Sequence, residues 1–424
     1  MELRELAADA YVYGFPLVFD VGQIDRFVRE GVGDLPGAPF NTFAHGKHLA
    51  TPKDEFVSVN NDTLYSIAQL DLSSGPVRLR VPDTGECYYV LQFVDAWSNN
   101  FAYVGKRATG TRAGEYLIVP PGWSGQADVP VIHAPTAVAT IVGRIACDGP
   151  DDLPNVFALQ SGFTLDGQPG NGIPDVKAPQ DLLFLERLRR WMAAFPPAPA
   201  DQDYAARFAP LGLLDGRPYT SADPEILAGL ADGRERIEQT MKAGHQAPVN
   251  GWDVNPHAFD YNLDFFELGT LDEAAWRLPD REQSYLVRAV SARAALWGNH
   301  GYEAVYPTVR VDSDGRQLNG AHSYTLRFEE LPPVGAFWSI TMYAAPDYYL
   351  VDNPIGRYSI GDRTPGIQHA GDGSLTIVMS HEEPADTANW LPAPAGDFRP
   401  MMRLYMPGQA VLDGSYRLPP VVRE

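Results

Sequence analysis

The sequence predicts a multidomain protein of β plus α parts, in which two β domains flank a mainly helical segment. Three observations indicate this order. Short apolar strand patterns separated by Gly and Pro turns occupy the first 165 residues, helical spacing dominates the middle third, and strand patterns return from about Tyr306. The 39 glycines and 37 prolines among 424 residues supply the many turns that short strands need.

The N-terminal part is expected to begin with a helix over its first thirty residues. Apolar side chains recur there at helical spacing, namely Leu3, Leu6, Ala10, Tyr13 and Leu17. Gly14-Phe15-Pro16 could break this helix. Strand patterns start at about Phe56 and predict a sandwich or barrel up to about residue 165: FVSV, LYSIAQLDL, VRLRV, CYYVLQFV, YLIV and AVATIVGRIAC.

The central third is expected to be mostly α. Residues 181–195 place one apolar stripe on a helix, formed by Leu182, Leu185, Leu188, Met192 and Phe195. Asp223 followed by Pro224 indicates an N-cap and the start of a helix that runs to about Lys242. Asp280 is expected to cap another helix, which ends near Gly298.

The C-terminal third returns to strand patterns, and this return defines the expected domains. The strand candidates are TVRVDSDGRQLNG, HSYTLRF, AFWSITMY, RYSI, LTIVMS and MMRLYM. We expect an N-terminal helix with a β-sandwich over residues 1–170, a mainly helical segment over 171–300 and a second β domain over 301–424.

Charge and composition exclude several classes of function. The formal net charge is −21, which disfavours binding to nucleic acid or to anionic membrane surfaces. No window approaches the roughly 20 apolar residues of a membrane span, and no signal peptide is visible, so a cytoplasmic location is expected unless a leader has been removed. The two cysteines, Cys87 and Cys147, exclude a disulfide framework and are expected to be buried thiols or a single bridge.

The motifs of common enzyme classes are missing from the sequence. There is no G-x-S-x-G elbow, no H-E-x-x-H and no phosphate-binding loop, and the dinucleotide spacing G-x-G-x-x-G does not occur. His45 and His48 lack an obvious third metal ligand. We therefore expect neither a cofactor nor a metal.

The segment NNDTLYS places Asn60, Asn61, Asp62 and Tyr65 at the start of an apolar strand. One interpretation is structural, because Asn and Asp side chains often satisfy the backbone amides of a turn. The other is functional, with Asp62 acting as an acid or base. A similar segment, DAWSNNF, places Asp95 and Asn99 after a buried strand. If both segments lie at one rim, Asp62 and Asp95 could form a carboxylate pair.

Two C-terminal strands are expected to carry one apolar face and one mixed face. In AFWSITMY, Trp338 lies on the face opposite Tyr343. In MMRLYM, Arg403 and Tyr405 lie opposite the methionines and the leucine. A mixed face of this kind is typical of a barrel interior that holds a ligand, but it can also meet solvent or another domain. A buried arginine such as Arg403 needs an acceptor, from the protein or from an anionic ligand.

Several of these runs, in fixed order, resemble two protein families. AYVYGFPLV, NNDTLYS, VPDTGECYYVLQFVDAWSNNFAYVG and GEYLIVPPGW resemble the domain-of-unknown-function 1254 family, and the C-terminal runs from DSDGRQLNGAHSYTLRF to LDGSYRLPP resemble the domain-of-unknown-function 1214 family. The resemblance implies an immunoglobulin-like sandwich, a helical segment and a C-terminal jelly roll. It implies no activity. The family pattern includes Asn60, Asp62, Thr63, Tyr65, Trp338, Tyr343, Asn353, Arg357, Tyr358, Trp390, Arg403 and Tyr405.

These observations lead to a functional hypothesis and two alternatives. We expect an enzyme that acts on a small polar organic molecule between the two β domains, with Asp62 as acid/base and Tyr65 and Tyr343 as orienting or proton-donating groups. The substrate-binding candidates are Asn60, Asn61, Asp95, Asn99, Trp338, Asn353, Arg357, Arg403 and Tyr405. The alternatives are a non-catalytic binder of a carbohydrate-like or other small molecule, and an oligomeric structural protein. A homo-oligomer is expected in each case.

Overall fold

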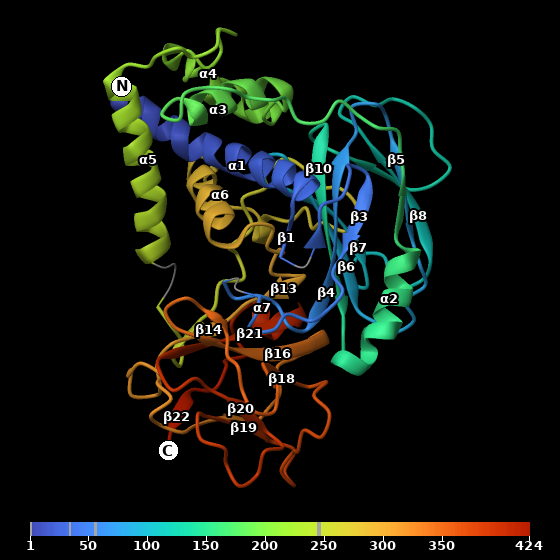
Figure 1. Cartoon of the computed structure of the whole chain (residues 1–424), viewed down its shortest axis with the longest axis vertical. Helices are drawn as coiled ribbons and strands as arrows, with labels where there is room; N and C mark the ends of the chain where they lie inside the picture. The colour runs from blue at the N-terminus through green and yellow to red at the C-terminus, as the bar shows by residue number, and fades with distance from the viewer. Residues whose placement is uncertain (1, 34, 55–56, 244–246) are drawn as a thin grey trace.

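The computed structural model describes residues 2–33, 35–54, 57–243 and 247–424. A layer of helices and two paired sheets form the N-terminal and central parts, and a second group of sheets forms the C-terminal part (Figure 1). This arrangement confirms the predicted succession of N-terminal sheets, central helices and C-terminal sheets.

The first helix, Leu3–Arg29 (α1), is continuous, so the expected break at Gly14-Phe15-Pro16 is wrong. Pro16 has no N–H and so cannot donate to the Val12 carbonyl inside the helix. Tertiary packing outweighs this loss, because α1 is buried against three other helices. These are Leu183–Ala194 (α3), Pro224–Ala243 (α5) and Arg281–Ala295 (α6).

The N-terminal sheets have five and four strands. The five-stranded sheet has the order β3-β4-β10-β6-β7, with bounds Thr42–His45 (β3), Thr63–Asp71 (β4), Val138–Ala146 (β10), Tyr89–Asp95 (β6) and Asn100–Gly105 (β7). The four-stranded sheet has the order β11-β5-β8-β9, with bounds Thr164–Asp166 (β11), Val77–Val81 (β5), Gly114–Val119 (β8) and Val131–His133 (β9). A two-stranded pair, Gly31–Val32 (β1) and Leu35–Pro36 (β2), follows α1.

Five of the six predicted N-terminal strands are present. FVSV is the exception: Phe56 lies outside the described residues, and residues 57–59 form a turn and an irregular segment rather than a strand. Every residue of β4, apart from Tyr65, is buried, as are all residues of β6 and β10. The strand patterns missed β3 and β7 of the five-stranded sheet, β9 and β11 of the four-stranded sheet, and the short pair of β1 and β2.

The central helices begin where their caps predict. Asp223 directly precedes α5, and its carboxylate accepts the N–H of Glu225, in the first turn of the helix, at 2.9 Å. The Asp280 carboxylate accepts the N–H groups of Glu282 and Gln283 at the start of α6. The remaining helices are Leu153–Gly162 (α2), Gln202–Ala206 (α4) and Gln409–Leu412 (α7), with 3-10 turns at Pro150–Asp152, Pro199–Asp201, Ala209–Leu211 and Ala274–Trp276.

The C-terminal sheets have seven and four strands. The larger contains the path β12-β14-β21-β16-β17, with β13 paired to β21 and β18 to β16; its bounds are Trp252–Asp253 (β12), Ala304–Val305 (β13), Thr308–Val309 (β14), Val334–Ala344 (β16), Tyr349–Leu350 (β17), Ser359–Gly361 (β18) and Phe398–Pro407 (β21). The smaller has the order β20-β19-β15-β22, with bounds Trp390–Pro392 (β20), Leu375–Ser380 (β19), Tyr324–Phe328 (β15) and Val421–Arg423 (β22). Strand β12 comes from the segment that was expected to be helical.

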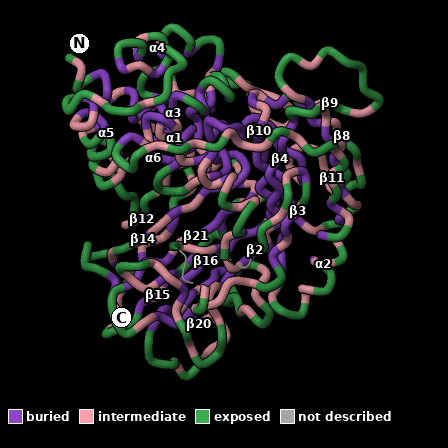
Figure 2. The backbone as a smooth tube through the Cα atoms, turned by 45° about the horizontal axis from the view of Figure 1, so that its top comes forward, coloured by how far each residue is buried: buried purple, intermediate pink, exposed green. Residues whose placement is uncertain are grey.

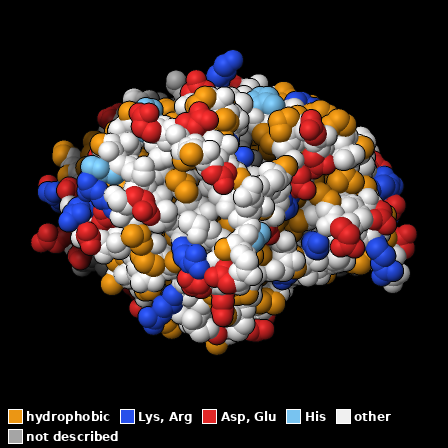
Figure 3. All heavy atoms as spheres, turned by 90° about the horizontal axis from the view of Figure 1, so that it is seen from below, with side chains coloured by type: hydrophobic (Ala, Val, Ile, Leu, Met, Phe, Trp, Pro, Cys, Tyr) orange, Lys and Arg blue, Asp and Glu red, His pale blue; other side chains and the backbone are white. Residues whose placement is uncertain are grey.

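Buried residues run through the helical layer, both pairs of sheets and the region between them (Figure 2). The aromatic side chains of Tyr88, Phe337 and Tyr405 join the N-terminal and C-terminal parts, and the Phe337 and Tyr405 rings stack at 4.3 Å. On the face shown in Figure 3, acidic and basic side chains are interspersed. None of the helices among the described residues combines the length and apolar character that a membrane span requires.

Helix α5 should be sensitive to side-chain growth where it meets α1. A Cβ atom at Gly233 would lie 2.6 Å from the Ala8 carbonyl oxygen and 2.7 Å from the Tyr11 Cβ. We expect Gly233→Val to lower the free energy of unfolding by about 2–3 kcal/mol, because the helices must separate. Ala231→Val, on the exposed side of α5, should cost less than about 1 kcal/mol. Urea unfolding of both variants measures this, and equal losses would contradict it.

Candidate functional site

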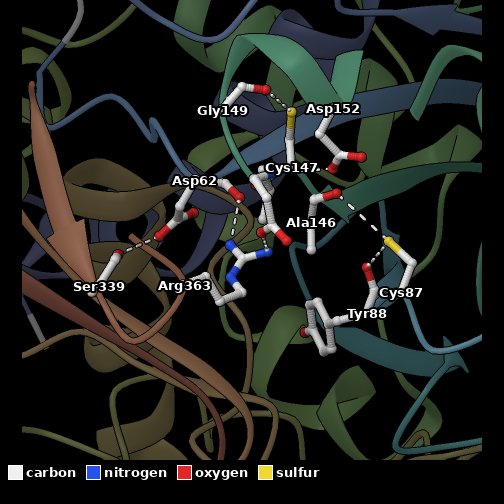
Figure 4. Close-up of polar contacts among 12 residues, drawn as sticks. Asp62, Cys87, Tyr88, Ala146, Cys147, Gly149, Asp152, Ser339 and Arg363 are labelled. Carbon is white, nitrogen blue, oxygen red and sulfur yellow. Dashed lines mark hydrogen bonds and ion pairs between the residues drawn. The ribbon is translucent and has the colours of Figure 1, made fainter. Parts of the chain in front are cut away.

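The Asp62 carboxylate lies at the centre of a polar cluster between the N-terminal and C-terminal sheets. Asp62 directly precedes β4 and is 4% exposed. Its Oδ2 accepts a short hydrogen bond from the Ser339 hydroxyl on β16, and its Oδ1 accepts the Tyr405 hydroxyl of β21 at 3.0 Å. The backbone carbonyl of Asp62 accepts a bond from Arg363. Figure 4 shows Asp62 between Ser339 and Arg363. Both carboxylate oxygens are therefore occupied by groups of the C-terminal unit.

Asn60 links the turn before β4 to the same tyrosine. Its Oδ1 accepts the N–H groups of Asp62 and Thr63 at 2.7 and 3.1 Å, which is the Asx-turn of the structural interpretation. Its Nδ2 donates to the Tyr405 hydroxyl at 2.8 Å. Burial raises the pKa of Tyr405 well above its usual value, so the phenol is neutral and donates to Asp62. Asn61 contacts the C-terminal part too, because its Oδ1 accepts the Ser359 hydroxyl.

Arg403 lies beside this cluster, on the predicted mixed face. Its guanidinium donates to Thr341 Oγ1 and to the Tyr343 hydroxyl, both at 2.8 Å, and to the Ser58 carbonyl at 2.9 Å. Tyr343 in turn donates to the Val59 carbonyl. Asp62 interacts electrostatically with Arg403. These hydrogen bonds attach the segment 58–62 to strands β16 and β21.

A second arginine, Arg144 of β10, faces the same region. Its guanidinium donates to Gln92 Oε1 at 2.8 Å and to the Trp297 carbonyl at 2.9 Å, and it lies 5.5 Å from the centre of the Tyr65 ring. Tyr65 and Tyr306 are half-buried, and both interact electrostatically with Arg144. The partners of Arg144 within the described part of the chain include no carboxylate.

Arg363 and the two cysteines border the cluster (Figure 4). Arg363 forms an ion pair with Asp148, and its guanidinium carbon lies 3.5 Å from the centre of the Phe337 ring. Both cysteines are free thiols. The thiol of Cys147 donates to the Gly149 carbonyl, and the thiol of Cys87 donates to the backbone carbonyls of Tyr88 and Ala146. Burial raises the pKa of Cys87 to about 11 and that of Cys147 to about 12, which makes both weak nucleophiles.

Asp95 does not join Asp62, so the hypothesis of a carboxylate pair is wrong. Strands β4 and β6 both pair antiparallel with β10, where Thr63 lies opposite Ala146 and Asp95 lies opposite Ala139. Seven residues of strand separate these positions, or roughly 23 Å at 3.3 Å per residue. The Asp95 carboxylate accepts two backbone N–H groups and the Asn99 side chain.

Three other candidates also lie away from the Asp62 cluster. Trp338 faces the C-terminal core, on the side of β16 opposite Ser339. Asn353 closes a local turn by accepting the Arg357 N–H. The Arg357 guanidinium donates to the carbonyl groups of Thr387, Ala388 and Trp390, and burial lowers its pKa. This arginine holds two loops of the C-terminal part together.

Four residues of the cluster were not among the candidates. Ser339 was on the mixed face of its strand, two and four residues from Thr341 and Tyr343, so its position was readable from the alternation. Arg144 is the single charged residue of the apolar run AVATIVGRIAC, which was an unused signal. Tyr306 and Arg363 carry no such pattern.

The described residues offer no evident metal centre, and two surface hollows lie elsewhere. No group of three or more His, Cys, Asp or Glu side chains in the described ranges is arranged to hold a metal ion. One hollow is lined by Val28 and by residues 39–42, 165–167 and 169–172. The other lies between α3 and the segment 196–216. Neither contains a candidate residue.

Loss of the Asp62 charge should destabilise the protein. Asp62→Asn replaces an oxygen that accepts a hydroxyl with an NH₂ group and removes the negative charge beside the buried Arg403. We expect the free energy of unfolding to fall by about 2–4 kcal/mol. Asp148→Asn, which breaks a half-exposed ion pair, should cost less than about 1 kcal/mol. Guanidinium unfolding measures both; similar losses would show that Asp62 is not a central contact.

The buried Asp95 should give the stability a defined pH dependence. Burial raises the pKa of Asp95 to about 6, although hydrogen bonds from Asn99 oppose the shift. Because an unfolded Asp titrates near 3.9, the folded protein holds the proton more tightly and loses stability as pH rises from about 4 to 6. Between pH 4 and 7, the free energy of unfolding of the wild type should fall by about 2–3 kcal/mol relative to that of Asp95→Asn. Exposed Asp151→Asn is the control and should follow the wild type; parallel curves for wild type and Asp95→Asn would refute the assignment.

Two protein-family models match this sequence, one in its N-terminal half and one in its C-terminal third. Residues 40–167 match the family described as Protein of unknown function (DUF1254), and residues 303–409 match the family described as Protein of unknown function (DUF1214). No curated protein matches the sequence.

Two solved structures resemble this chain. The VPA0106 protein from Vibrio parahaemolyticus is 24% identical, and the match covers 100% of both chains with a TM-score of 0.76, which shows a shared fold. An uncharacterized protein from Burkholderia cenocepacia is 11% identical, with 98% of this chain and 89% of that chain covered and a TM-score of 0.46. The chain therefore carries a DUF1254 region followed by a DUF1214 region.

Proposed function

We propose that the protein is an enzyme that acts on a small anionic organic molecule between its N-terminal and C-terminal sheets, by acid/base chemistry without a cofactor. One observation carries this proposal. Two buried arginines, Arg144 and Arg403, face one region; Asp62 lies beside Arg403, but the partners of Arg144 among the described residues include no carboxylate. Buried cations of this kind favour a bound anion.

Tyr405 is the group best placed to move a proton. It donates to Asp62, accepts from Asn60 and interacts electrostatically with Tyr65, Tyr306 and Arg403. A phenol in this position can take a proton from a substrate while giving its own to Asp62, so it never carries a charge. Both oxygens of Asp62 already accept hydroxyl groups, so its role is to accept that proton and to position Tyr405.

The two arginines would have different roles, one in binding the substrate and one in positioning other groups. Arg144, next to the half-buried Tyr65 and Tyr306, would bind the anionic group or stabilise the negative charge that develops in the transition state. Arg403 would hold Tyr343 and the segment around Ser58 in place. Hydrolysis, isomerisation and elimination are all compatible with these roles.

The second candidate function is a non-catalytic binder of a small molecule. The enclosure of Asp62 favours it, because both carboxylate oxygens already accept hydroxyl groups and no free oxygen is left for a substrate. The same enclosure would suit an oligomeric structural protein. We also propose that the N-terminal sheets form an immunoglobulin-like sandwich, that the C-terminal sheets form a jelly roll and that the protein is a homo-oligomer.

Substitution of Tyr405 separates these functions. The probe is a mixture of small hydroxy acids and of esters and lactones that each carry a free carboxylate, and NMR measures both binding and conversion. We expect conversion by the wild type, a loss of at least about 100-fold in Tyr405→Phe with binding retained, and loss of binding in Arg144→Met.

Tyr324→Phe is the matched control, because Tyr324 is also buried and its hydroxyl accepts a single backbone N–H, that of Asn319. It should convert the mixture at the wild-type rate. Binding without conversion in the wild type would favour the binder, and unchanged conversion in Tyr405→Phe would remove this tyrosine from the mechanism. If nothing in the mixture binds, the anion proposal fails.

A further inference from the structure

A second group of buried polar atoms, around Arg288 of α6, lacks hydrogen-bond partners among the described residues. The atoms are Nε and Nη2 of Arg288, the hydroxyls of Tyr13 and Ser98, and Oδ2 of Asp20. The four side chains are each at most 5% exposed. Native proteins leave few such atoms unpaired, so a group of five needs an explanation.

These atoms belong to one region at the junction of α1, α6 and the turn from β6 to β7. The Arg288 guanidinium carbon lies 5.4 to 5.6 Å from the ring centres of Tyr13, Trp97 and Tyr285. Asp95 interacts electrostatically with both Arg288 and Asp20. Tyr261 donates to the Ser98 carbonyl and interacts with the same charges.

The missing partner in this region is an acceptor. The guanidinium nitrogens can only donate, and the hydroxyls of Tyr13 and Ser98 can donate as well. Burial raises the pKa of Asp20 well above its usual value, which favours the protonated carboxyl group, and that form is a donor. Asp95 cannot serve all of them, since its oxygens already accept the N–H groups of Trp97 and Asn99 and the Asn99 side chain.

We propose that this region is a binding site for a small organic carboxylate, which lies against the Nε–H and Nη2–H groups of Arg288. These two groups form one edge of the guanidinium, and that edge pairs with both oxygens of a carboxylate at once. The rings of Tyr13, Trp97 and Tyr285 offer an apolar wall to the hydrocarbon part of the ligand. Tyr13 and Ser98 supply further donors.

This site is independent of the one proposed around Arg144. Asp95 and Thr63 lie opposite Ala139 and Ala146 of β10, which are seven residues apart. The carboxylate site is built around Arg288 of α6 and the side chains of α1, whereas the other site is built around Arg144 of β10 and Tyr405 of β21. Either proposal can fail without the other.

The test is the thermal unfolding of the full chain in acetate, butyrate and benzoate at constant ionic strength, with the matching amides as neutral controls. We expect the carboxylates to raise the unfolding midpoint of the wild type by a few degrees and the amides to leave it unchanged. Arg288→Met should abolish the rise. Arg187→Met, which removes another arginine that lies over a tryptophan ring and has an unpaired Nε, should keep it.

A rise that persists in Arg288→Met, or no rise in the wild type, would overturn the proposal. If Arg288→Met does not fold, a crystal of the wild type grown with 4-bromobenzoate decides. An anomalous bromine peak near Arg288, with the carboxylate on the Nε and Nη2 edge, supports the site. Water alone on that edge overturns it.

Discussion

The carboxylate of Asp62 is the contact on which the placement of the two β parts depends. It belongs to the N-terminal unit, yet both of its oxygens accept hydroxyl groups from the C-terminal strands β16 and β21. Its neighbours repeat the pattern, since the carbonyl oxygens of Ser58 and Val59 accept from Arg403 and Tyr343. A small rotation of one unit against the other would break several of these bonds at once and leave buried polar groups unpaired. The relative orientation is therefore fixed by hydrogen bonds as much as by the aromatic packing beside them.

Much of this arrangement was predictable from local patterns. The period of two in AFWSITMY and MMRLYM placed Tyr343, Arg403 and Tyr405 on one side of their strands, and the structure pairs those strands directly. The caps at Asp223 and Asp280 were equally readable, because each depends on a side chain and the backbone next to it.

The predictions that were wrong concern residues whose conformation or position depends on distant parts of the chain. Whether α1 continues through Pro16 is decided by its packing against helices that lie about 170 to 280 residues further on. The separation of Asp62 from Asp95 follows from the strand order, in which β4 and β6 run in the same direction on either side of β10. Two polar segments, one before its strand and one after, then fall at opposite ends of the sheet. No spacing within either segment contains that information.

The partners of Asp62 also set an order of events during synthesis. Asp62 leaves the ribosome 277 residues before Ser339. At about 5–20 residues per second, the N-terminal unit exists for roughly 15–55 s before its interface can close. Throughout that time its turn at residues 58–62 is exposed to water, which must satisfy the groups that β16 and β21 later cover. The polar character of this surface thus suits a nascent chain, because an apolar surface of the same size would be open to aggregation until translation reached the C-terminal strands.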